Sequence, residues 1–153
     1  MQWEQLFEDL EDQLASEWEA ERSALDSESE RLRIARLELR SRLRRIAADR
    51  SIVVVEVTDQ RRLRAVLHDV GADWVAARGT EDHILTLIPL TAIIAIELDD
   101  TGILASIDAP PPPLPLRERM TLGFVLRDLA RRRAPVSLAL VGGAHRHGTI
   151  DRA

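Results

Sequence analysis

The sequence predicts an α+β protein with a long N-terminal α-helix, a small five-stranded antiparallel barrel, and then a second helix and a β-hairpin. Three observations support this fold class. No Gly or Pro occurs between Gln2 and Ala48, where apolar residues recur at helical spacing. Five short apolar segments, separated by turn-forming residues, follow between 52 and 97. Finally, the sequence resembles itself when it is displaced by 83 residues.

Residues 1–35 are predicted to form a helical or coiled-coil extension. This segment is acidic, because residues 1–30 hold eleven acids against Arg22 alone. A helix of this length usually has a partner, and both a short helical hairpin and a coiled coil fit the imperfect heptads. We therefore expect a homo-oligomer or a protein partner bound through one apolar face of the helix, made of Trp3, Phe7, Leu10, Leu14 and Trp18.

Residues 36–100 are predicted to contain the end of this helix and the barrel. Asp59-Gln60 and residues 79–82 are turn candidates, and Gly71 ends the second apolar segment. Closure into a barrel would remove the exposed strand edges. The predicted strands are residues 52–57, 63–70, 74–77, 83–88 and 93–97.

Residues 98–109 are predicted to be a loop, and the Pro-rich linker between the two domains is placed at 101–116. The run at 110–115 favours a stiff polyproline II spacer over a ligand for a partner domain, because it lies between two structured units. A helix at 117–132 and a strand at 136–141 should follow. Gly142-Gly143 then predicts a hairpin turn into residues 145–152.

The internal repeat aligns the first helix and hairpin with residues 117–153. Leu39 falls on Leu122, and Val53 falls on Val136. Ala153 falls on Val70, so the second copy stops after its second strand. We expect either that the chain is truncated relative to the native gene or that the hairpin packs on the first barrel or on another subunit.

The second copy resembles the start of Sm-like domains, the small β-barrel family that includes Lsm- and Hfq-like proteins. The resemblance rests on the run LARRRAPVSLALVGG at 129–143 and on HGTID at 147–151. The first copy's IPLTAIIAI at 88–96 is similar to the family's closing motif. The resemblance implies a bent five-stranded barrel that forms rings, in which strand four of one subunit pairs with strand five of the next.

The resemblance also implies RNA binding, but only the basic helix ends match. Leu90-Thr91 stand where Hfq-like proteins have a Lys-His pair. Trp74 is the only aromatic residue of the barrel that could stack on a base, and it could equally belong to the core. The candidate RNA- or phosphate-binding residues are Arg131, Arg132, Arg133, Arg127, Arg50, Arg44 and Arg45.

We expect no catalytic residue, metal site or cofactor. The chain has no cysteine and no recognisable nucleophile triad or phosphate loop. His145 and His147 have no third convergent ligand and are interpreted as a surface pair. The N-terminus is unlike a signal peptide, and the longest apolar stretch is too short to span a bilayer, so we expect a cytoplasmic protein without a membrane segment.

These features predict a non-enzymatic interaction or scaffold protein with an oligomerising Sm-like barrel and a partner-binding N-terminal helix. The alternative is a divergent Sm-like RNA-binding post-transcriptional regulator. The net charge of −5 and the missing base-contact residues favour the first hypothesis.

Overall fold

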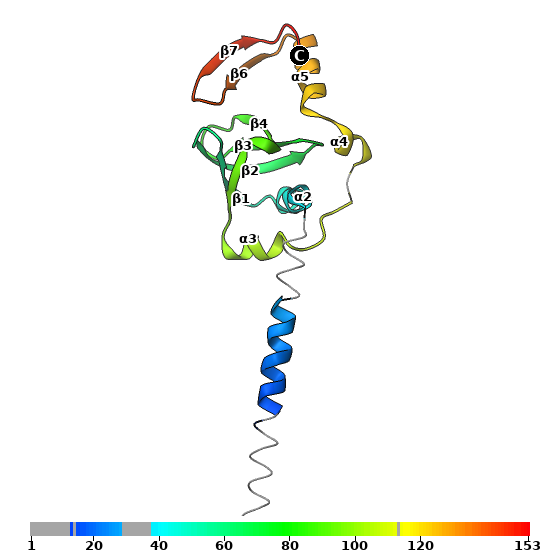
Figure 1. The fold of residues 1–153 in the computed structure, drawn as a ribbon. Helices are drawn as coiled ribbons and strands as arrows, with labels where there is room; N and C mark the ends of the chain where they lie inside the picture. Colours follow the sequence, from blue (N-terminus) through cyan, green and yellow to red (C-terminus); the bar gives the residue numbers. More distant parts are fainter. Residues whose placement is uncertain (1–12, 14, 29–37, 113) are drawn as a thin grey trace, which may run out of the picture. The chain divides into compact units, whose positions relative to one another are not determined.

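The structure is a computed structural model that describes residues 13, 15–28, 38–112 and 114–153 (Figure 1). The chain divides into two units, residues 1–37 and 38–153. Residues 15–28 of the first unit are helical, as the sequence predicts. The continuity of the predicted helix from 2 to 48 depends on residues outside the described ones, so it stays a prediction.

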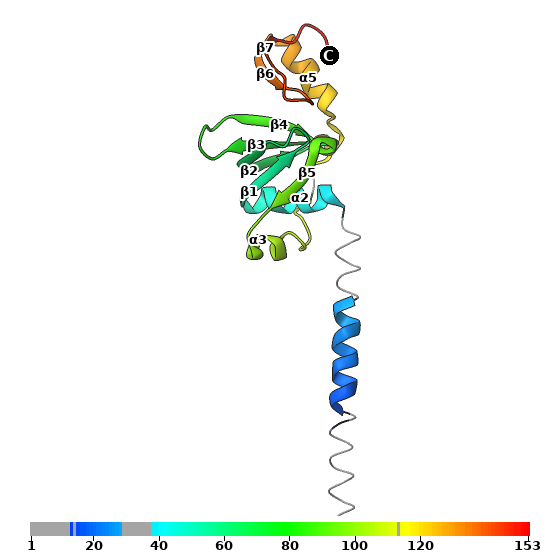
Figure 2. The same cartoon turned by 60° about the vertical axis from the view of Figure 1, so that its left-hand side comes forward.

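The second unit begins with helix α2 (Leu39–Asp49), which packs along strand β2. Its apolar side is buried and includes Leu43, Ile46 and Ala47. The helix ends at Arg50, whose φ of 54° places it in the left-handed region and turns the chain into the sheet. Figures 1 and 2 show α2 across one face of the sheet.

The five-stranded antiparallel sheet confirms the strand prediction, with boundary shifts of one or two residues. The strand order is β4-β3-β2-β1-β5, so β4 and β5 are the two outer strands. The closed barrel itself stays a prediction. The strands are β1 (Ile52–Val57), β2 (Arg62–Val70), β3 (Trp74–Gly79), β4 (Leu85–Pro89) and β5 (Ile93–Glu97), with a short 3-10 helix η1 (Leu90–Ala92) between the last two.

The core lies between α2 and the inner face of the sheet. Alternate residues of β1 point into it, as the period of two requires. The pairing register shifts between Glu56 and Val57 on β1 and between Leu67 and Asp69 on β2, and such irregularities bend a sheet. Buried members include Val53, Val55, Val57, Ala65, Leu67, Val75, Ala77 and Ile88.

The predicted loop at 98–109 is wrong in part, because α3 (Asp100–Ala105) forms there. The Asp99 carboxylate caps this helix by accepting the Gly102 N–H at 2.7 Å. The residues after α3 are then held against α2 and the core. The Arg42 guanidinium donates to the buried Ser106 hydroxyl at 2.9 Å, and Ile107 is buried.

The single helix predicted at 117–132 is also wrong, because it is two helices, α4 (Pro115–Arg119) and α5 (Leu122–Arg131). Met120 between them is extended, and its carbonyl oxygen accepts hydrogen bonds from the Ala72 N–H and the Trp74 indole, each at 2.9 Å. These two donors, one in the turn between β2 and β3 and one at the start of β3, take the carbonyl that would accept an intrahelical hydrogen bond in a continuous helix.

The predicted C-terminal hairpin is confirmed as β6 (Pro135–Ala139) and β7 (His145–Thr149). Gly142 and Gly143 both have positive φ, at 92° and 82°, as a tight hairpin turn requires. The pairing of Val136 with Gly148 is the pairing of Val53 with Ala65 displaced by 83 residues.

Candidate functional site

The outer strands of the sheet carry exposed apolar side chains. Leu85 on β4, Ile84 just before it, and Ile94 on β5 are each more than half exposed. β4 has no charged residue, and β5 has only Glu97, which forms an ion pair with Arg62 at 2.5 Å. Outer strands of folded proteins are usually protected by charge, proline or a covering segment. Pro89 protects only the end of β4, so residues 85–88 and β5 are candidate surfaces for strand pairing.

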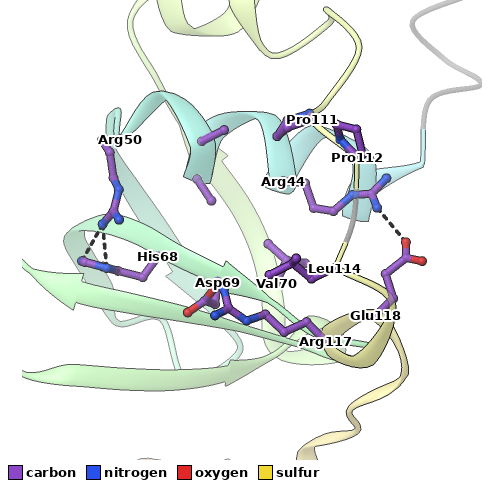
Figure 3. A pocket seen from close by; sticks show the side chains of 12 residues that line it. Arg44, Arg50, His68, Asp69, Val70, Pro111, Pro112, Leu114, Arg117 and Glu118 are labelled. Carbon is purple, nitrogen blue, oxygen red and sulfur yellow. Dashed lines mark hydrogen bonds and ion pairs between the residues drawn. The ribbon is translucent and has the colours of Figure 1, made fainter.

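A groove of about 270 Å³ lies between α2, β2 and the Pro-rich segment (Figure 3). The Pro-rich segment contributes Pro111, Pro112 and Leu114 to its walls. This part of the predicted linker therefore lies against the first helix and sheet. The remaining lining residues are Arg44, Ala47, Ala48, Arg50, His68, Asp69, Val70, Arg117 and Glu118.

Most charged groups of the groove are paired with each other, as the dashed lines of Figure 3 indicate. The Arg44 Nη1 lies 2.6 Å from Glu118 Oε1, and Arg117 forms an ion pair with Asp69. Arg50 Nη1 lies 2.7 Å from His68 Nδ1. The first two pairs join α2 and β2 to residues 117–118, and the third joins the end of α2 to β2, so the charges of the groove are engaged by the chain itself.

Further hydrogen bonds fasten the same segment to the turn between β2 and β3. The Leu122 N–H donates to the Asp73 carboxylate at 2.7 Å. Arg40 of α2 bridges the turn and the segment, because its Nε donates to the Gly71 carbonyl at 3.1 Å and its Nη2 to the Glu118 carbonyl at 3.4 Å. A Cβ on Gly71 would lie 2.2 Å from Trp74 Nε1, so only glycine allows the indole this position. Trp74 is buried, which makes it a core residue and not an exposed base-stacking platform.

The predicted phosphate-binding arginines are largely engaged within the protein. Arg44 is paired with Glu118, Arg45 Nε lies 3.0 Å from Asp49 Oδ2, and Arg50 contacts His68. No ion pair is recorded for Arg127 or Arg133 within the described part of the chain.

Asp128 forms ion pairs with two members of the arginine cluster at the end of α5 and offsets one of their two charges. Arg131 forms an ion pair with it, and Arg132 Nε lies 2.7 Å from its Oδ2. The hydrogen bond from Arg131 is the main cause that holds the pKa of Asp128 below its ordinary value, and the charge of Arg132 adds to it. The cluster thus has less free positive charge than its sequence suggests.

The described part of the N-terminal helix bears Trp18, whose side chain is largely exposed, and Leu25 seven residues later is exposed too. Residues 15–28 contain five acids and Arg22. The other predicted members of the partner-binding face, Trp3, Phe7, Leu10 and Leu14, lie outside the described residues.

The described residues contain no group of three or more His, Asp or Glu side chains that could hold a metal ion. His145 and His147 are both exposed on β7. No helix within the described ranges is both long enough and apolar enough to cross a membrane.

Reasoning from the sequence missed two features. The exposed apolar residues at the outer strands could have been suspected from the lack of charge in residues 84–96. The groove had no such signal, because Arg44 and Glu118 are 74 residues apart.

The sequence matches no protein-family model, no curated protein and no solved structure.

Proposed function

We propose that the protein is a self-associating, non-enzymatic interaction or scaffold protein. The exposed apolar side chains on both outer strands of the sheet carry this proposal. An unpaired strand offers a row of backbone donors and acceptors, and apolar side chains beside them favour pairing with another strand. Copies would assemble when β4 of one pairs with β5 of the next.

The arrangement around residues 88–96 supports an Sm-like mode of assembly. β4 ends at Pro89, η1 turns the chain, and β5 begins at Ile93, yet these two strands lie at opposite edges of the sheet. A head-to-tail contact between two different edges produces rings when the rotation closes. The resemblance of this segment to the closing motif of Sm-like domains implies the same contact.

The N-terminal helix supplies the second part of the proposal. An acidic helix with an exposed Trp18 suits a partner with an apolar groove and basic rim. Deleting residues 1–30 should then abolish partner capture while the sheet keeps its fold, as measured by circular dichroism. Unchanged self-association and unchanged partner binding in the deletion would remove this role from the helix.

The test of assembly is the average mass of the chain in sedimentation equilibrium. Ile94→Lys places a charge on the outer edge of β5 and should lower that mass, because lysine on an edge opposes strand pairing. The control is Leu104→Lys on α3, which is also largely exposed but lies outside the sheet. Wild-type mass in both variants would contradict assembly through the sheet edges.

A further inference from the structure

The hairpin β6–β7 has the same pairing register as β1–β2, but its apolar side chains are far more exposed to solvent. The relative exposures of Val55 and Val57 are 0% and 5%, whereas Leu138 and Leu140, their counterparts 83 residues later, are 40% and 44% exposed. Helix α5 buries no side chain, whereas α2 buries three. The face that forms the core in β1–β2 is thus also apolar in β6–β7, but there it is open to solvent.

The free edge of β6 is also built for pairing. The Leu140 N–H donates to the Ala144 carbonyl at 2.8 Å, so the backbone of Leu140 faces β7. Because this orientation alternates along a strand, the backbone groups of Val136 and Leu138 also face β7, and those of Ser137 and Ala139 face outwards. Their counterparts in β1 are Val54 and Glu56, which pair with Glu97 and Ala95 of β5. In the first copy, this edge is therefore covered by an antiparallel strand.

The charge pattern indicates which strand would cover β6. Residues 134–144 contain no charged side chain, while β7 carries Arg146 between His145 and His147. An edge without charge can meet a second copy of itself without repulsion, whereas β7 paired with itself would bring arginines together. A two-fold axis also makes the pairing antiparallel, which is the geometry of the β1–β5 pair.

We infer that β6 pairs with β6 of a second copy of this chain about a two-fold axis at Leu138. Ser137 then lies opposite the partner's Ala139, and both residues have their backbone groups directed across the axis. Leu138 lies opposite the partner's Leu138, and Val136 opposite the partner's Leu140. The open apolar faces of the two hairpins then become continuous across the axis, where Leu138, Val136 and Leu140 pack against their cross-strand neighbours. This interface is separate from the edges β4 and β5, on which the proposed assembly depends.

Single cysteines test the register, because the chain has none of its own. Residue 138 would be a pair without backbone hydrogen bonds, with Cα atoms about 4.5 Å apart, within the range of a disulfide. Leu138→Cys should give a covalent dimer on mild oxidation with diamide. Leu140→Cys is the matched control, since it lies two residues later, just past the end of β6, on the same face and with nearly equal exposure. Its two copies would be roughly 13 Å apart and should not cross-link.

A mixture of Val136→Cys and Leu140→Cys chains should form a mixed dimer, although each variant alone does not. Ser137→Pro removes the outward N–H that would donate across the axis, but it leaves the hydrogen bonds between β6 and β7 intact. Adding Ser137→Pro to Leu138→Cys should therefore abolish the cross-link. Equal cross-linking at 138 and 140, or none at 138, would overturn the inference.

The cross-link should persist in the Ile94→Lys background, because β5 is not part of this interface. If Ile94→Lys leaves the mass of the wild type unchanged but Leu138→Cys still cross-links, the proposed sheet-edge assembly fails and this inference stands. If the mass falls with Ile94→Lys but Leu138→Cys does not cross-link, this inference fails alone.

Discussion

Removing the Glu118 side chain should destabilise the second unit more than removing the arginine that it pairs with. Arg44 Nη1 and Glu118 Oε1 are 2.6 Å apart, and the two side chains are 20% and 37% exposed. Arg44 Nε is buried without a hydrogen-bond partner among the described residues. Exposed ion pairs contribute ~0.2–1 kcal/mol, and breaking a buried pair costs ~3–5 kcal/mol. Because the Arg44–Glu118 pair is half-buried, its contribution should lie between these two ranges. Glu118→Ala should therefore lower the free energy of unfolding by about 1–2 kcal/mol.

Arg44→Met should cost less than about 1 kcal/mol, because it removes the unpartnered Nε and leaves a carboxylate that water can reach. The assay is a double-mutant cycle by urea unfolding at one fixed protein concentration, with an expected coupling energy of about 1 kcal/mol. The control cycle uses Arg45 and Asp49, a pair on α2 at 3.0 Å, for which ~0.3–0.5 kcal/mol is expected. A coupling no larger than the control, or a greater cost for Arg44→Met, would refute the reasoning.

Three further outcomes follow from the contacts described above. Trp74→Phe loses the indole bond to Met120 and some core volume, so urea unfolding should show a loss of about 1–2 kcal/mol, and a neutral effect would mean that this bond does not hold the segment. The pKa of Asp128 is lowered, so its stabilising effect is present above its unfolded pKa of about 3.9 and is lost as pH falls through the lower folded value. Asp128→Asn should therefore lower the melting temperature at pH 7, and this deficit should shrink as the pH falls below about 3.9; a deficit that does not change with pH would contradict the ion-pair account. For the RNA-binding alternative, replacing Arg131, Arg132 and Arg133 by Ser should abolish salt-dependent binding of single-stranded RNA in fluorescence anisotropy, and a wild type that does not bind would end that alternative.

Local pattern was sufficient to predict the strands and the hairpin turns. The apolar run Ile52–Val57 and the Gly142-Gly143 turn are encoded within a few residues, so strand composition and turn chemistry identify them. The helix α3 was missed because Asp100–Ala105 is short and contains a glycine. Its stability comes from the Asp99 cap and from Arg42 on another helix, and no window of local sequence contains the second of these.

The break between α4 and α5 could not be read from periodicity for a similar reason. Residues 117–132 keep a helical pattern, but Ala72 and Trp74 take the carbonyl of Met120. The sequence shows where arginines cluster but not which of them are paired. Whether Arg131 is available to a phosphate depends on Asp128, and that pairing is a matter of side-chain geometry.

The strand order also has a consequence for the way the sheet assembles during folding. β1, β2, β3 and β4 are consecutive antiparallel neighbours, so each can form as a local hairpin on the previous strand. β5 instead reaches back to β1, where Val54 pairs with Glu97, and this contact must close a much longer loop. We expect β5 to join last and its amide protons to exchange with solvent before those of β2 and β3. The edge of β1 that β5 covers would then remain open for the longest time during folding.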